Sequence, residues 1–251
     1  MVRFVLHAMA ALLLTAVTQL GGIAWLAALA FRQGGGRFWA AFLLGYALLM
    51  GAAQLAAPSF GRVPLPSREG PLRMQSAFYC IAMRNFVSPE LREVAIGAAG
   101  RVARQHPGTV TLALDANFPL PAPIPMVPHL SHGDGDKLDF AFFYADAAGY
   151  APGRSASPIG YFAFERVSEE TCPPAFPALR WEMRWLRPAM AGLKLEPERT
   201  TALLRALLDD PRVGKIFLEP PLAARLGVSG GKRRFQGCRA ARHDDHIHVQ
   251  L

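Results

Sequence analysis

The first 57 residues most restrict what this 251-residue chain can fold into, because they contain three basic residues and no acid. Two apolar runs, residues 4–31 and 38–57, are separated by a short segment around three glycines (residues 32–37). A helix of roughly 20 apolar residues spans a bilayer, so each run is long enough to cross one. We therefore expect a transmembrane helical hairpin over residues 1–57. The alternative is a cleaved signal peptide that ends at the small residues 28–30.

The rest of the chain has the composition of a globular domain. Of the 27 basic residues, 24 remain after the first three are subtracted, and they face 19 acids, a net charge of +5. A proline- and glycine-rich segment, 58–75, predicts a linker, which leaves 76–251 as one domain with a core of its own. The basic residues are not interleaved with aromatic ones, so we expect no nucleic-acid partner.

Residue periodicity in the domain predicts separate helices and strands, which is the pattern of an α+β fold. The first helix is expected to begin with Ser88 as its N-cap and Pro89 as its first residue. Helices are predicted over 88–105, 180–186, 198–208 and 221–226, and strands over 109–114, 140–144, 159–164, 213–218 and 246–251.

Five of the seven histidines fall in two short segments. The first segment, residues 128–139, contains His132 and Asp139 on either side of a glycine-rich turn, and the second, residues 243–248, reads His-Asp-Asp-His-Ile-His. Histidine and carboxylate together are what a catalytic zinc requires, namely three protein ligands and one position open to water. Either segment alone predicts only a turn or a polar tail, and the metal site is inferred because both occur together.

Alternation along the second segment supports this interpretation. Ile247 and Val249 alternate with His246 and His248, so one face of a strand belongs to the core and the other presents two imidazoles. The same period of two places Asp139 on the face of its own strand that carries fewer large apolar side chains. Both segments are therefore expected to deliver metal ligands from packed strands.

The pattern His132-x6-Asp139 followed by His246-x-His248 resembles that of the zinc peptidases that cut peptidoglycan, in the superfamily of D-Ala-D-Ala carboxypeptidases and the hedgehog signalling domain. The strongest likeness is to the penicillin-insensitive murein DD-endopeptidases, with weaker likenesses at 180–185 and 213–222. The resemblance covers about residues 85–251. It implies an α+β fold in which a small antiparallel sheet with flanking helices carries the zinc site.

The resemblance also implies the metal ligands, which are His132, Asp139 and His248 on a single Zn²⁺ ion. Some relatives bind a second zinc through a histidine three residues before the first ligand, where His129 stands here. Their downstream Asp-x-x-His is missing from residues 160–170, so we expect one ion, with His129 as a loop residue or a hydrogen-bond partner at the rim of the site.

Three residues of the second segment are implied as catalytic: His246, Asp245 and His243. His246 would lie beside the zinc-activated water, and the base that takes the proton of the water would be Asp245 or His243, a choice that the sequence leaves open. Asp244 is expected to be a structural acid.

The expected function is that of a membrane-anchored zinc metallopeptidase, a murein endopeptidase that hydrolyses the peptide crosslinks of peptidoglycan. Two alternatives stay open: a zinc-containing binding or regulatory module of the same fold without turnover, and a membrane-tethered peptidase acting on other peptides. The exact bond and the oligomeric state are not determined by the sequence.

The expected location is the bacterial inner membrane, with the domain in the periplasm. The distribution of arginines points weakly the other way, because Arg3 and three arginines between 62 and 73 lie on the side of the domain. One disulfide is possible outside the cytosol, and the sequence does not choose its pair among Cys80, Cys172 and Cys238.

Overall fold

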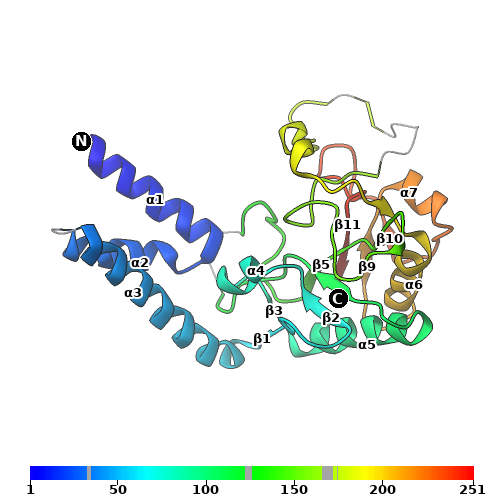
Figure 1. The fold of residues 1–251 in the computed structure, drawn as a ribbon, viewed down its shortest axis with the longest axis horizontal. Coiled ribbons are helices and arrows are strands. Elements are labelled where there is room, and N and C mark those ends of the chain that lie inside the picture. The colour runs from blue at the N-terminus through cyan, green and yellow to red at the C-terminus, as the bar shows by residue number, and fades with distance from the viewer. Residues whose placement is uncertain (33–34, 122–125, 166–171, 174) are drawn as a thin grey trace.

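Apolar helices precede a mixed α+β domain in the computed structural model of the chain (Figure 1). The structure describes residues 1–32, 35–121, 126–165, 172–173 and 175–251. The α-helices are α1 (Val2–Thr18), α2 (Gly21–Ala28), α3 (Gly35–Ala56), α4 (Ala77–Ile81), α5 (Pro89–Gln105), α6 (Pro197–Leu208) and α7 (Pro220–Arg225). Three 3₁₀ segments are η1 (Leu29–Phe31), η2 (Ala57–Phe60) and η3 (Arg184–Ala189). The strands are β1 (Val63–Pro64), β2 (Leu72–Met74), β3 (Phe86–Val87), β4 (Thr111–Ala113), β5 (Lys137–Ala141), β6 (Tyr144–Asp146), β7 (Gly149–Tyr150), β8 (Lys194–Leu195), β9 (Lys215–Phe217), β10 (Arg233–Arg234) and β11 (His246–Gln250).

The first apolar run is divided into α1 and α2, which meet at Gln19. This residue has a left-handed φ of 64°, and its side-chain amide donates to the carbonyl of Leu120 at 2.6 Å. Among the described residues, only the helix over Gly35–Phe60 is long and apolar enough to span a membrane. The predicted hairpin of two spanning helices is therefore not confirmed and remains a proposal.

The last turns of α3 pack against the domain. Ala53 of α3 and Ala57, the first residue of η2, are buried in a small apolar cluster with Met83 and Phe86. Higher on the same helix, the Tyr46 hydroxyl donates to the carbonyl of Ile81 at 2.6 Å. The helix and the domain are therefore joined by direct packing as well as by the chain that connects them.

Part of the segment predicted as a linker belongs to the domain. β1 pairs with β3, and β2 is an edge strand of the main sheet, parallel to β4. Leu65, between the two strands, is buried in the main core. Pro64 is itself paired with Phe86, so the prolines of this segment do not prevent it from pairing.

The main sheet has six strands in the order β10-β9-β11-β5-β4-β2, beside a two-stranded and a three-stranded sheet. The four central strands are antiparallel, as predicted, but both edges pair in parallel, β10 with β9 and β2 with β4. The prediction of a small antiparallel sheet is thus correct at the centre and wrong at the edges. The α+β class is confirmed.

Helices α5 and α6 cover the apolar face of this sheet. Ser88 caps α5, since its hydroxyl accepts from the amide of Leu91 at 3.3 Å, as the sequence predicts. Leu91 of α5 and Leu203 of α6 share one buried cluster with Phe140 and Ile247 of the sheet. The other face of the sheet is left for polar side chains.

Two predicted elements do not form. Residues 159–164 are turns and not a strand, because Gly160 and Phe162 take left-handed φ values of 83° and 68°. The predicted helix over 180–186 is also wrong: Met183 is left-handed at φ 39°, and a 3₁₀ segment follows it as η3. Both stretches instead use their side chains and amides to bind groups around the site described next.

Candidate metal centre

The turn before β5 places His132 against the sheet. Gly135 in this turn has φ 97°, and a Cβ there would lie 1.6 Å from Nη1 of Arg62, so the position requires glycine. Its amide donates to the side-chain oxygen of Asn117 at 3.1 Å, and Arg62 donates to the carbonyl of Gly133 at 2.6 Å. These contacts hold the turn in which His132 is buried.

The register of β5 against β11 decides which donors meet. Asp139 stands directly opposite His248, and Phe140 opposite Ile247. Because opposed residues of an antiparallel pair share a face, the carboxylate and the imidazole lie together while Phe140 and Ile247 face the core. The alternation predicted from the sequence is therefore confirmed.

The three side chains predicted as metal ligands converge. Nδ1 of His248 lies 2.7 Å from Oδ1 of Asp139 and 3.2 Å from Nε2 of His132. The distance between Oδ1 of Asp139 and Nε2 of His132 is 3.6 Å. All three residues are buried. Donors held at zinc-ligand distances from one tetrahedral ion are separated by about 3.3 Å. The observed spacing fits such an ion, and the role of these residues as its ligands remains a prediction.

His129 approaches the same carboxylate from the other side. His129, His132 and Asp139 offer donor atoms that lie within 4.8 Å of one another, so this group could hold a metal ion. Nδ1 of His129 is 3.0 Å from Oδ2 of Asp139 and 3.3 Å from Oδ2 of Asp115, yet it forms no well-directed hydrogen bond among the described residues. His129 therefore lies in the loop beside Asp139, and it is a candidate for the third ligand in place of His248. Residues 166–170, part of the stretch that lacks the second-zinc motif, lie outside the described residues.

Hydrogen bonds on the far side of each imidazole set which nitrogen faces the cluster. Nδ1–H of His132 donates to the carbonyl of Ala116 at 2.6 Å, which leaves the Nε2 lone pair for an ion. The side-chain amide of Gln250 contacts Nε2 of His248 at 2.8 Å. The amide nitrogen of Gln250 donates to Nε2, so Nδ1 of His248 carries the proton and donates to Oδ1 of Asp139 at 2.7 Å. His132 therefore presents a free Nε2 lone pair to the cluster, and Nδ1 of His248 would have to give up its proton to bind an ion.

Three further residues hold the carboxylate side of the cluster, and the sequence assigned none of them a role. The Tyr161 hydroxyl donates to Oδ2 of Asp139 at 2.8 Å and accepts from the amide of Asp115. Asp115 in turn forms a two-point ion pair with Arg84, at 2.5 and 2.6 Å. No local pattern marks these residues, because they come from separate segments and meet only in the folded domain.

Charge in the cluster favours an ionised Asp139 carboxylate and shifts the pKa values of His132 and His248 in opposite directions. Burial raises the pKa of Asp139, but the surrounding histidines, His132 above all, outweigh burial and hold that pKa well below its usual value. Burial lowers the pKa of His132, and Asp139 more than compensates, so the net direction is upward. For His248 burial prevails over Asp139 and lowers the pKa to about 4.

His246 and Asp245 form a buried pair beside the cluster. Nδ1 of His246 lies 2.5 Å from Oδ1 of Asp245, and Oδ2 of Asp245 accepts from the amide of Phe162 at 2.6 Å. The other nitrogen of His246 is 3.9 Å from Oδ2 of Asp139. Burial lowers the pKa of His246, but Asp245 and Asp139 outweigh it and raise the pKa to about 9. Asp245 thus orients His246 and has both oxygens engaged.

His243 is buried against the same rings. Its ring centroid lies 4.9 Å from that of His246 and 5.6 Å from that of His248. Its Nδ1 has no hydrogen-bond partner among the described residues. Burial, helped by the two neighbouring histidines, lowers its pKa well below the usual value. His243 is therefore a neutral imidazole with a free nitrogen. Asp244 turns away and pairs with Arg242, at 2.9 and 2.5 Å, as expected of a structural acid.

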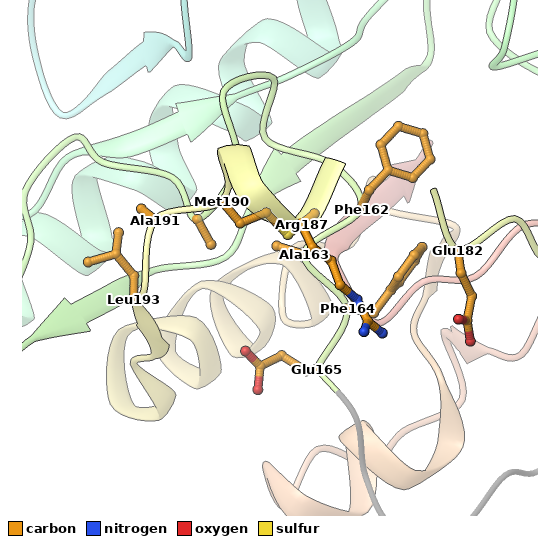
Figure 2. Close-up of a pocket in the computed structure, with 10 residues that line it drawn as sticks. Phe162, Ala163, Phe164, Glu165, Glu182, Arg187, Met190, Ala191 and Leu193 are labelled. Atoms are coloured by element: carbon orange, nitrogen blue, oxygen red, sulfur yellow. The ribbon is translucent and has the colours of Figure 1, made fainter. Parts of the chain in front are cut away.

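A pocket of about 190 Å³ lies beside the segment that binds Asp245 (Figure 2). Phe162, Phe164 and Glu165 line it together with Arg187 of η3 and Met190, the residue after η3. Phe162 joins the pocket to the site, because its amide binds the Asp245 carboxylate. The pocket combines aromatic rings with charges of both signs.

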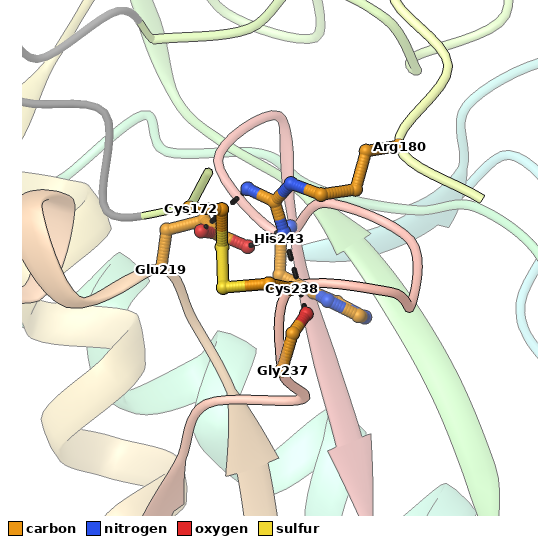
Figure 3. Close-up of a disulfide and its surroundings, with 6 residues drawn as sticks. All are labelled: Cys172, Arg180, Glu219, Gly237, Cys238 and His243. Carbon is orange, nitrogen blue, oxygen red and sulfur yellow. Dashed lines mark hydrogen bonds and ion pairs between the residues drawn. A yellow bond between two sulfur atoms is a disulfide. The ribbon is translucent and has the colours of Figure 1, made fainter. Parts of the chain in front are cut away.

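A disulfide lies close to His243 and Glu219 (Figure 3). Cys172 is bonded to Cys238, which settles the pairing that the sequence left open, and Cys80 is free. Beside the disulfide, Arg180 donates to both oxygens of Glu219, at 3.2 and 2.9 Å, and Glu219 accepts from the amide of His243 at 3.3 Å.

All six predicted site residues are thus brought into one buried cluster. They are His132, Asp139, His248, His246, Asp245 and His243. Comparisons of the chain with protein-family models and with curated proteins give no match.

Proposed function

We propose that this chain is a membrane-anchored zinc metallopeptidase that hydrolyses the peptide crosslinks of peptidoglycan. The observation that carries the proposal is the convergence of His132, Asp139 and His248, with donor atoms 2.7 to 3.6 Å apart, next to a second set of histidines. Two imidazoles and one carboxylate are the donors of many catalytic zinc sites. The sequence resemblance described above supports peptidoglycan as the substrate.

Zinc suits this donor set better than calcium or magnesium, which prefer oxygen ligands. The backbone of Ala116 and the side chain of Gln250 orient the two imidazoles, as supporting residues do around protein-bound metals. When bound, zinc supplies Lewis acidity, which polarises the scissile carbonyl and makes water acidic enough to lose a proton near neutral pH.

The two candidates for the general base differ in geometry. Both carboxylate oxygens of Asp245 are occupied, one by His246 and one by the Phe162 amide. Nδ1 of His243 has no such partner among the described side chains. We therefore assign His243 as the base that takes a proton from the attacking water and returns it to the leaving amine. His246, held by Asp245, donates a hydrogen bond to the carbonyl oxygen as negative charge develops there.

The location proposed for this activity is the periplasmic face of the inner membrane. The helix over Gly35–Phe60 supports an anchor, because its length and composition suffice to cross a bilayer. The Cys172–Cys238 disulfide supports an oxidising compartment, in spite of the arginine distribution. The partners are then peptidoglycan peptides and the membrane itself.

The test uses the full chain in detergent, because α3 packs on the domain. We expect about one zinc per chain and conversion of crosslinked muropeptides of purified sacculi to monomers. A chelator should abolish the cleavage, and added zinc should restore it. His132→Ala and His248→Ala should each lose zinc and cleavage. The matched control is His106→Ala, which removes a histidine at the end of α5, away from the cluster, and should retain both.

The possible outcomes separate the alternatives. Zinc binding with no hydrolysis of any murein fragment, together with saturable binding to sacculi, would favour a binding module. Cleavage of unrelated peptides, with sacculi left intact, would favour a peptidase of another substrate class. A folded protein that binds no zinc would contradict the proposal.

A further inference from the structure

Two segments of the domain expose large apolar side chains on the side that meets the N-terminal helices. In α4, Phe78 and Ile81 are 48% and 58% exposed, and in the loop before the cluster, Val127 and Leu130 are 49% and 58% exposed. We call these four residues the apolar face. Contiguous apolar surface of this kind marks a place where a protein meets another apolar phase.

Arg84 ties the two segments of the apolar face together. It follows α4 in the chain, and its amide donates to the carbonyl of Tyr79 at 2.8 Å. Its guanidinium donates to the carbonyl of Val127 at 3.0 Å and to that of Val17, in α1, at 3.3 Å. Arg84 therefore joins α4 through its backbone amide, and the loop and the first apolar helix through its side chain.

The position of α4 along α3 sets the depth of the apolar face. Tyr46 of α3 is bonded to the carbonyl of Ile81. The exposed apolar surface of α3 continues on both sides of this contact, since Leu44 is 64% exposed and Leu55 is 85% exposed. From Tyr46 to Leu55 a helix rises by about 14 Å. Tyr46 lies near the middle of α3, so its contact places the end of α4 that carries Ile81 beside the middle of the apolar helix surface and not beyond its end.

We propose that the apolar face lies in the lipid bilayer, at the level of the acyl chains, so that the domain is partly embedded in the membrane. The proposal rests on the membrane anchor proposed above. If the leucines of α3 lie in lipid, Ile81, whose carbonyl is bonded to Tyr46, meets the same lipid, and Arg84 holds the loop at Val127 beside α4. Because these side chains are apolar, placing them in lipid does not incur the desolvation free energy that buried polar groups would require.

This arrangement also indicates where the metal cluster is accessible from outside the domain. His129 stands between Val127 and Leu130 in the chain, and its side chain is 18% exposed, while those of His132 and Asp139 are 1% exposed. The accessible edge of the cluster is therefore flanked by the apolar face. A peptide would then reach the site next to the membrane.

The test measures the surroundings of single nitroxide labels on the full chain, reconstituted in vesicles of phosphatidylcholine and phosphatidylglycerol. Labels are attached at Phe78→Cys and Leu130→Cys in a Cys80→Ala background. Oxygen concentrates in lipid and a charged nickel complex in water, so the ratio of the two collision rates reports the phase. Leu44→Cys, on the exposed surface of α3, is the lipid control. Glu93→Cys, on α5, is the water control, since the Glu93 side chain is 73% exposed.

We expect oxygen-to-nickel ratios at 78 and 130 that exceed the ratio at 93 by several-fold and approach the ratio at 44. Ratios at 78 and 130 equal to that at 93, with a lipid-like value at 44, would overturn the embedded face and leave the anchor intact. A water-like value at 44 would overturn both. Zinc content and hydrolysis are not part of this readout, so its failure is distinct from failure of the proposed chemistry. Ile81→Cys repeats the test within α4 if Phe78→Cys does not fold.

Discussion

Asp245 touches His246 and the amide of Phe162 and stands apart from the three donors proposed to hold zinc. Asp245→Asn keeps the shape of the side chain and removes its charge, so His246 loses its ionic partner while the donor set stays in place. We expect peptide cleavage to fall by roughly 100-fold or more, the range of a lost acid–base contribution, with about one zinc still bound. Steady-state cleavage rates and zinc content measure this. Unchanged cleavage, or loss of zinc with the charge, would contradict the assignment.

His129 and His248 make different use of the Asp139 carboxylate, since His248 faces Oδ1 with His132, and His129 faces Oδ2. If His248 is the third ligand, His248→Gln abolishes zinc binding. His129→Gln should weaken zinc affinity by no more than about 10–100-fold, the effect of a supporting residue. Zinc titration of the two variants with a competing chelator compares them directly. The reverse order of affinities would make His129 the ligand.

At the scale of elements, strand β11 contributes to both the core and the site, because alternate residues of a strand point to opposite faces of the sheet. Ile247 is fully buried under α5 and α6, while its neighbours His246 and His248 face the cluster. Ile247→Val removes one methylene group from the core and should lower the free energy of unfolding by about 1 kcal/mol. The zinc content should not change, because the opposite face is untouched.

The matched control for this substitution is Ile159→Val, where the side chain is 39% exposed. It should change stability by less than about 0.5 kcal/mol. Thermal unfolding of the full chain in detergent compares the two variants. Equal shifts would show that the packing of β11 against the helices does not carry the stability assigned to it.

For the whole molecule, the disulfide is the one covalent tie between distant parts of the domain. It links Cys172 and Cys238 across a sequence separation of 66. Closing a loop of this length restricts the unfolded chain by about 4 kcal/mol in the chain-entropy treatment. We expect the double variant Cys172→Ser/Cys238→Ser to unfold at a clearly lower temperature, while the control Cys80→Ser, at the free cysteine, shifts little. Equal midpoints for the two variants would exclude a stabilising role.

Some features follow from the sequence alone, because they depend on neighbours along the chain. The cap and first turn of α5 are set by Ser88 and Pro89, and the two faces of β11 by alternation from residue 246 onward. Clustering of histidines marked the two segments that carry the site, and the family resemblance selected His132, Asp139 and His248, whose side chains meet in the structure. Hydrophobic length also marked residues 38–57 as able to span a membrane, and α3 has that property.

Other features were decided only by tertiary structure, because they depend on which distant segments pack together. The predicted strand over 159–164 is replaced by turns, since Tyr161 and the Phe162 amide bind aspartates from other segments. Contacts between distant segments also decided three further features. These are the disulfide between Cys172 and Cys238, the pairing of β2 inside the expected linker, and the break between α1 and α2 at Gln19. Each group satisfies a buried partner far away in the sequence, and no local pattern records such a partner.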